Sequence, residues 1–168
     1  MEIMRTSMLA IIVTAALACA AAPAAAQNRP SLGVSLGGAF PGSPTANIPS
    51  DRQASFNWGF YVNLPLLETF NIVPSAELYK FGQANATDFD LAFKFIVPLQ
   101  RFALFAGISP GLTTVNSAPV IHIGALGGAS FRLAGNLGAF VQAKYNFVID
   151  GSQNTSVIHL NTGLLFNF

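Results

Sequence analysis

Residues 55–64 read SFNWGFYVNL, a stretch in which every second residue is strongly apolar. The apolar residues occupy the even positions, and the residues between them are small or polar. Because successive side chains of a β-strand point to opposite faces, this period of two places the apolar side chains on one face. The stretch therefore predicts a strand with one apolar and one polar face.

The same alternation recurs along the chain. It is clear over 89–97, 137–147 and 158–168, and weaker over 31–40, 70–81, 102–112 and 120–131. Together with 55–64 these stretches make eight segments of about ten residues, the length that a tilted membrane strand requires.

The composition is unusual for a water-soluble domain. Apolar residues make up 52% of the chain and charged residues 9%, with a mean hydropathy of +0.50, whereas about a quarter of the residues in soluble domains are charged. After residue 26, however, no stretch approaches the ~20 continuous apolar residues of a membrane helix. Since backbone polar groups inside a bilayer must be bonded internally, a closed barrel is the remaining solution. We predict an all-β protein, a transmembrane antiparallel up-and-down β-barrel of eight strands in the bacterial outer membrane.

The partners expected from this placement are outer-membrane lipid and lipopolysaccharide. A net charge of +1 gives no reason to expect a nucleic-acid partner. We expect a monomer.

The connections between the predicted strands alternate in length. Short turns in such barrels face the periplasm and longer loops face outward, so both ends of the barrel chain should lie on the periplasmic side. The expected short turns are 65–69, 98–101 and 132–136, and the expected longer loops are 41–54, 82–88, 113–119 and 148–156. Pro74 and Pro110 fall inside strands, and because proline cannot donate to a ladder we expect those strands to contain bulges or to end early.

The N-terminal segment is typical of a secretory signal peptide. Arg5 precedes an apolar run over 8–22, and three alanines at 24–26 precede Gln27. We expect cleavage after Ala26, which leaves residues 27–168 as one barrel domain. Cys19 lies in the apolar run, so it either leaves with the signal peptide or, in the alternative of a lipoprotein signal, is acylated.

Polar and charged residues gather on the predicted inward face. An eight-stranded lumen is just wide enough to be filled by side chains, and buried charges have to be paired. We therefore expect a polar network that plugs the lumen, with a carboxylate of Glu77 or Asp90 paired to Lys144 or Lys94. The network residues are Glu77, Asp90, Lys94, Gln142, Lys144, His159 and Asn161, with His122 on a neighbouring strand.

No catalytic or cofactor motif is evident. Catalysis by a nucleophile requires a hydroxyl or thiol beside a base, and no such arrangement is recognisable. The two histidines are far apart in sequence and no cysteine follows Cys19, so no metal-ligand spacing exists. No glycine-rich turn leads into a helix, as a phosphate-binding loop would. We predict a protein that is not an enzyme and uses no cofactor or metal.

The C-terminal residues 161–168, NTGLLFNF, resemble the assembly signal of bacterial outer-membrane barrels. The residues that match are Asn161, Gly163, Phe166 and Phe168, and the resemblance implies recognition by the barrel-assembly machinery. More broadly, residues 28–168 resemble the small outer-membrane β-barrel family that includes the opacity proteins and the barrel of outer membrane protein A. The segment 137–147, which ends KYNF, is similar to the penultimate strand of that family.

Three functions are compatible with these features. The first is a non-catalytic outer-membrane barrel with a structural or surface-interaction role. The second is a narrow passive pore for small solutes, which requires an open lumen. The third is a soluble exported barrel of the lipocalin type, which requires apolar residues inside and charged residues outside.

Overall fold

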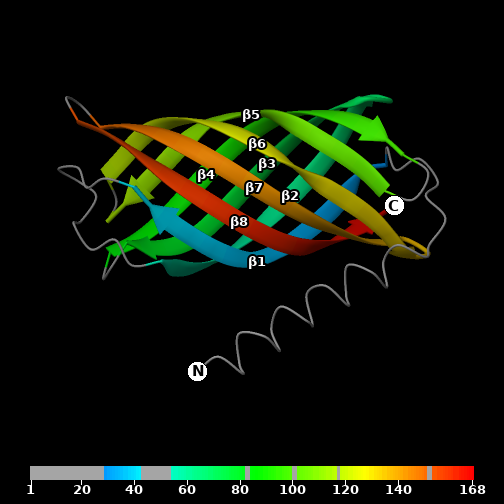
Figure 1. Ribbon diagram of the computed structural model, residues 1–168, viewed down its shortest axis with the longest axis horizontal. Helices are drawn as coiled ribbons and strands as arrows, with labels where there is room; N and C mark the ends of the chain where they lie inside the picture. Colours follow the sequence, from blue (N-terminus) through cyan, green and yellow to red (C-terminus); the bar gives the residue numbers. More distant parts are fainter. Residues whose placement is uncertain (1–28, 43–53, 82–83, 100–101, 117, 151–152) are drawn as a thin grey trace.

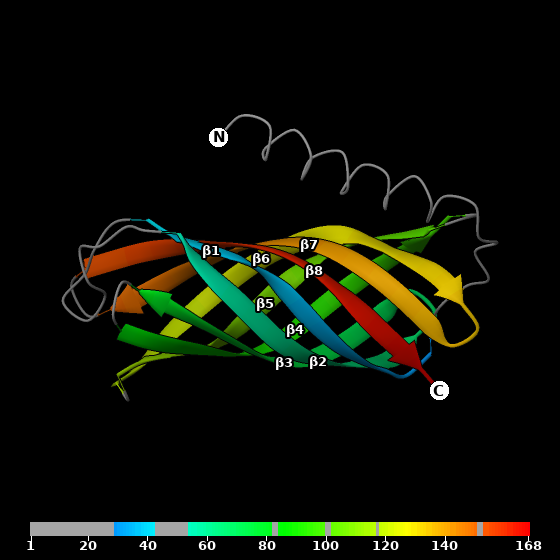
Figure 2. The same cartoon turned by 90° about the horizontal axis from the view of Figure 1, so that it is seen from below.

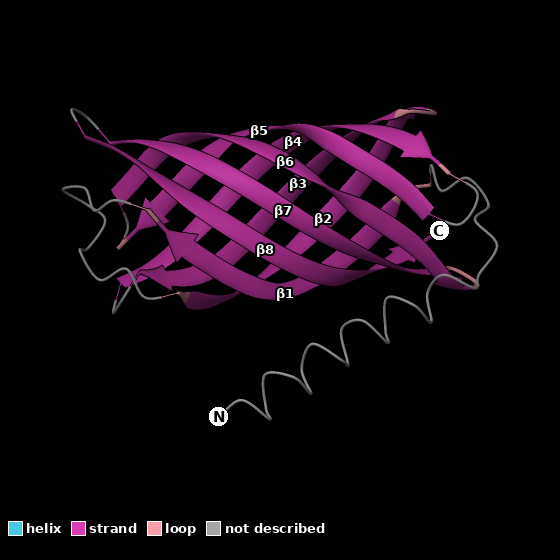
Figure 3. Cartoon of the chain, viewed as in Figure 1, coloured by secondary structure: helices cyan, strands magenta, loops and turns pink. Residues whose placement is uncertain are grey.

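The computed structural model describes residues 29–42, 54–81, 84–99, 102–116, 118–150 and 153–168 (Figure 1). The predicted signal peptide, with Cys19, lies outside these ranges. Eight strands account for nearly all of the described residues (Figure 3). They are β1 (Ser31–Pro41), β2 (Ser55–Leu67), β3 (Phe70–Phe81), β4 (Ala84–Pro98), β5 (Phe102–Val115), β6 (Ala118–Ala134), β7 (Leu137–Asp150) and β8 (Gln153–Asn167). No helix within the described ranges has the length and apolar character needed to span a membrane.

The strands form one closed barrel in which each pairs antiparallel with the next and β8 pairs with β1. Closure leaves no strand edge with unbonded backbone groups, as an apolar surrounding demands. The predicted all-β, eight-stranded up-and-down barrel is confirmed. We call the end where β1 begins and β8 finishes the terminal end, and the opposite end, where β1 leads toward β2, the loop end (Figures 1 and 2).

The outer surface is apolar around the whole barrel. Phe60 on β2, Leu91 on β4 and Leu160 on β8 are 50%, 43% and 51% exposed. Every strand except β3 carries exposed large apolar side chains, and on β3 the outward Ile72 and Leu78 are half-buried. The residues between them on these strands face the lumen, as the period of two predicts. This arrangement suits a lipid surrounding. It is the reverse of what a soluble barrel of the lipocalin type requires.

Three of the four connections at the loop end are shorter than the sequence predicts. β4 already begins at Ala84, β5 continues to Val115 and β7 to Asp150, so only the 42–54 connection is long. The strand ends keep the period of two with small and polar residues: Ala84 and Ala86 are buried, while Asn85 is exposed. Because these ends are rich in small and polar residues, with only Val115, Val148 and Ile149 as larger apolar residues, their sequence resembles a loop.

The expected effect of the two strand prolines is also wrong. The register shifts occur between Pro65 and Leu67 and between Arg132 and Ala134, not at Pro74 or Pro110. The β2–β3 ladder lacks the pairs beside Pro74 but keeps its register on both sides, and Pro74 pairs with Leu91 on β4. A proline removes one hydrogen-bond donor from the ladder, and here the pairing of β3 with β4 keeps the strand regular at Pro74.

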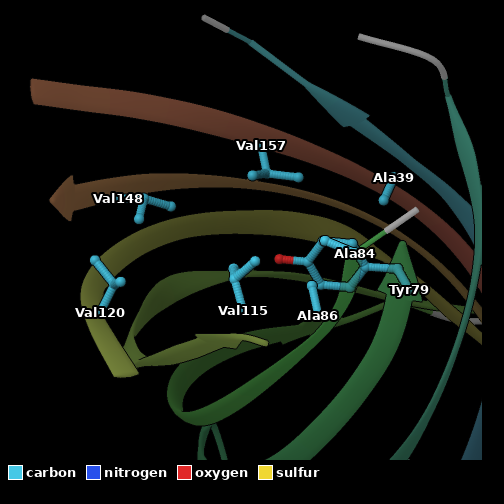
Figure 4. Packing of buried hydrophobic residues seen from close by; sticks show 8 residues of the cluster. All are labelled: Ala39, Tyr79, Ala84, Ala86, Val115, Val120, Val148 and Val157. Atoms are coloured by element: carbon cyan, nitrogen blue, oxygen red, sulfur yellow. The ribbon is translucent and has the colours of Figure 1, made fainter. Parts of the chain in front are cut away.

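The inside of the barrel contains three layers of side chains. The loop-end layer is apolar, and its side chains point into the space that the strands enclose (Figure 4). It consists of Ala39, Tyr79, Ala84, Ala86, Val115, Val120, Val148 and Val157. The terminal-end layer is also mostly apolar and consists of Tyr61, Val73, Ala92, Phe105, Leu126 and Phe140. Between the two lies a layer of buried charged groups, the candidate site.

Candidate functional site

The polar layer is built from six inward-facing side chains on five strands. Each occupies the parity that faces the lumen, and all are buried. They are Glu77 on β3, Asp88 and Asp90 on β4, His122 on β6, Lys144 on β7 and His159 on β8. Register brings them to one level, since Glu77 pairs with Asp88 across β3–β4 and Lys144 pairs with His159 across β7–β8.

Lys144 lies at the centre of this layer. Its Nζ is 2.8 Å from Asp90 Oδ2, 3.0 Å from Glu77 Oε1 and 3.9 Å from Asp88 Oδ2. One ammonium thus faces carboxylates from β3 and β4 across the lumen. Glu77 also accepts a 2.6 Å hydrogen bond from the Tyr61 hydroxyl. In a dry interior such short charged contacts offset the cost of removing the groups from water.

His122 connects the two aspartates through β5. Its Nε2 lies 2.8 Å from Asp90 Oδ1, and its Nδ1 lies 2.8 Å from Thr113 Oγ1. The Thr113 hydroxyl donates to Asp88 Oδ1 at 2.8 Å, and the Ser109 hydroxyl donates to Asp90 Oδ1 at 3.0 Å. Three adjacent strands are therefore tied together by side chains as well as by their ladders.

His159 occupies the opposite side of the layer. Its Nδ1 lies 3.0 Å from Asn57 Nδ2 and 3.2 Å from Glu77 Oε2, and its Nε2 lies 3.4 Å from Asp88 Oδ2. The edge of the Tyr79 ring packs against the imidazole at 4.9 Å. This histidine links β8, the last strand, to β2, β3 and β4.

The structure separates the predicted lumen residues into two groups. Glu77, Asp90, Lys144 and His159 meet in the polar layer, as described above. Lys94 and Gln142 form a separate pair nearer the terminal end, with Lys94 Nζ donating to Gln142 Oε1 at 2.8 Å. Asn161 Nδ2 donates to the Tyr61 hydroxyl at 3.1 Å. Of the two candidate lysines, Lys144 pairs with carboxylates, whereas in the described part of the chain Lys94 forms no salt bridge.

Sequence reasoning missed several members of the network. Asp88 was placed in a loop, yet it lies on β4 with the same parity as Asp90, and that spacing was the signal available. The Tyr79 hydroxyl and the Asn146 amide each donate to Asp88 at 2.8 Å. Thr113 was likewise placed in a loop. These neutral partners could not be found without the register of the strands.

Carboxylate oxygens of Asp88 and Asp90 and a ring nitrogen of His122 lie within 4.8 Å of one another, a grouping that could hold a metal ion. The sequence spacing of the histidines predicted no such grouping. Each of the three side chains is, however, already bonded to protein: Asp88 to Tyr79 and Asn146, Asp90 to Lys144, and His122 to Thr113. The Lys144 ammonium supplies the positive charge that an ion would bring.

Thr113, His122 and Asp90 follow one another in the order of a nucleophile, a base and an orienting acid. The Thr113 hydroxyl gives its proton to Asp88 rather than to the imidazole. Thr113 and His122 are fully buried, so no substrate reaches them. What this arrangement can do is hold strands together.

The four residues of the assembly-signal pattern divide between the two faces of β8. Asn161 is buried in the lumen, and a Cβ on Gly163 would lie 2.5 Å from Phe140 Cε1. Phe166 and Phe168 are exposed on the outer surface at the terminal end, with ring centroids 6.4 Å apart.

No family model and no curated protein sequence matches this chain. Among solved structures, the chain is similar to Neisserial surface protein A, with a TM-score of 0.60 at 14% sequence identity over 82% of this chain and 97% of that chain. The protein has the fold of the small eight-stranded outer-membrane β-barrels. A de novo designed transmembrane β-barrel matches 84% of this chain and 99% of its own, with a TM-score of 0.49 and 10% identity. Ail, the attachment invasion locus protein of Yersinia pestis, matches 82% of this chain and 99% of its own, with a TM-score of 0.46 and 11% identity. With its closed backbone and continuous apolar exterior, this barrel is an outer-membrane protein that crosses the bilayer with strands.

Proposed function

We propose that the protein is a non-catalytic outer-membrane barrel whose lumen is sealed and whose role is structural or one of surface interaction. The observation that carries this proposal is the enclosure of the polar layer between two apolar layers. Its charged groups form ion pairs with one another and are shielded from water at both ends.

A conducting pore would need a continuous polar path. At the loop end, Val148 and Val157 are 0% exposed and pack with Ala39. At the terminal end, the Phe140 ring packs edge-on against Tyr61 at 5.3 Å. An ion crossing the lumen would have to shed its hydration shell in both layers and displace Lys144 from its carboxylates.

The orientation follows from the position of the long connection. Residues 42–54 leave β1 at the loop end, which we assign to the cell exterior, and the terminal end then faces the periplasm. Exposed large apolar side chains on seven of the eight strands face the lipid, and lipopolysaccharide is the lipid expected around the outer half. An apolar surface of this extent on every side supports a monomer in the bilayer.

Planar-bilayer recording distinguishes the sealed barrel from the narrow-pore alternative. Protein refolded in detergent is added to the bilayer, and insertion is verified on the same sample in vesicles by heat-modifiable gel migration and protease protection. We expect no discrete conductance steps above the lipid baseline. Reproducible steps that scale with the amount of inserted protein would overturn the sealed lumen and favour the pore.

A further inference from the structure

A cavity of about 50 Å³ lies in the lumen between the terminal-end layer and the end of the barrel. Its walls are the side chains of Tyr61, Phe105 and Phe140, and Lys94 also lines it. Asn63 and Ser130, both half-buried, are polar lining residues close to strand ends. This volume has room for a few water molecules or one small solute.

Lys94 is a buried lysine that makes no salt bridge among the described residues, although Glu77 and Asp90 act on its charge from a greater distance. Its side chain is 8% exposed, and its Nζ donates one hydrogen bond, to the neutral Gln142. The ammonium also lies 4.7 Å from the centroid of the Phe105 ring and 5.8 Å from that of Tyr61. An ammonium carries three donors, so the amide oxygen and the ring faces satisfy it in part.

The carboxylates of the lumen are engaged elsewhere. Glu77 and Asp90 bind Lys144, and the Tyr61 hydroxyl binds Glu77 from the side of the terminal-end layer. Buried charges in proteins are paired or bind ions, because an isolated charge in an apolar surrounding costs several kcal/mol. At Lys94 none of these carboxylates is in direct contact with the ammonium, and the cavity provides space for an anion that would be.

We propose that this cavity binds a small monovalent anion, the size of chloride or acetate, against the Lys94 ammonium. The aromatic walls of Phe105 and Phe140 exclude larger hydrated anions and accommodate a halide or the methyl group of acetate. The site lies between the terminal-end layer and the end of the barrel. Anion binding there therefore does not depend on whether the lumen conducts.

Chloride-35 NMR of the refolded barrel in a zwitterionic detergent tests this directly. The wild-type protein is expected to broaden the chloride line in a saturable manner, and acetate is expected to reverse the broadening. Lys94→Met should reduce the excess line width to that of detergent alone. Lys80→Met, which removes an exposed lysine of β3 outside the cavity, should leave the line width unchanged.

Ser130→Leu provides a second route, because it fills the cavity and leaves Lys94 in place. Ser130→Leu should also abolish the broadening. It tests whether the anion binds in the cavity even if Lys94→Met fails the heat-modifiable gel assay of folding. The proposal is overturned if the wild-type protein produces no saturable broadening, or if the broadening persists in the folded Lys94→Met or Ser130→Leu protein.

Discussion

The ammonium of Lys144 lies 2.8 Å from the carboxylate of Asp90, and both side chains are 1% exposed. Glu77 shares the same ammonium at 3.0 Å. A single cation on β7 is therefore shared by carboxylates on two strands at the opposite wall of the barrel. We expect the stability of the folded barrel to depend on Lys144 more than on any other polar side chain described above.

Loss of Lys144 should be the most damaging change in the polar layer. Lys144→Met leaves buried carboxylates without their cation, and we expect the free energy of unfolding to fall by about 3–5 kcal/mol. Glu77→Gln should cost less, since Lys144 keeps Asp90. The double variant should be more stable than Lys144→Met alone, because it removes one of the uncompensated charges. Urea unfolding in detergent, followed by Trp58 fluorescence, measures all three.

The control for this series is Lys80→Met, which changes an exposed lysine and should leave the free energy of unfolding unchanged. An open and hydrated lumen would screen every substitution in the layer. Effects near zero for Lys144→Met would therefore contradict the sealed network.

An arginine on the outer surface should destabilise the barrel according to its depth in the bilayer. Val141→Arg, at an outward position within β7, should cost about 2–4 kcal/mol, whereas Leu137→Arg at the first residue of the strand should cost about 0–1 kcal/mol. Folding into lipid vesicles at increasing urea, assayed by heat-modifiable migration, compares the two. Equal folding of both variants would mean that Val141 does not face the hydrocarbon.

Phe168→Ser should impair assembly in cells more than it impairs stability. Phe168 is exposed at the terminal end, and the hydrogen bond from its backbone N–H to the Pro30 carbonyl at 3.1 Å does not require the ring. Outer-membrane levels of the variant should fall severalfold, while refolding in detergent stays near that of the wild type. Phe102→Ser removes another outward ring of the same end and should not reduce the levels to the same degree. Normal levels of the Phe168 variant would remove the basis for an assembly role.

Gly163→Ala should destabilise the barrel by about 1–3 kcal/mol through overpacking. The new methyl group would clash first with the backbone oxygen of Val34 and would lie 2.5 Å from Phe140 Cε1 in the terminal-end layer. The matched change Gly127→Ala meets only the Phe105 carbonyl oxygen at 3.7 Å and should be neutral or slightly stabilising. Thermal unfolding in detergent compares the pair, and equal melting temperatures would contradict the tight packing at Gly163.

The alternation of apolar and polar residues along each strand is a local property, and it can be predicted from the amino-acid sequence alone. The sidedness of Phe60, Leu91 and Leu160, the number of strands and the closure of the barrel all follow from it. Closure follows because an apolar exterior in lipid allows no free strand edge. The inward placement of Glu77 and Lys144 belongs to the same local information.

Pairing inside the lumen, by contrast, depends on the register between strands and on their tilt around the barrel. Lys94 and Lys144 have the same inward parity, yet register sets Lys144 opposite His159 at the level of the carboxylates and places Lys94 beside Gly107, nearer the terminal end. Asp88 and Thr113 join the network because β4 and β5 extend beyond the segments whose alternation is evident in the sequence. Such contacts between distant segments arise only when the backbone hydrogen bonds of all eight strands are satisfied together, and no single stretch of the chain carries that information.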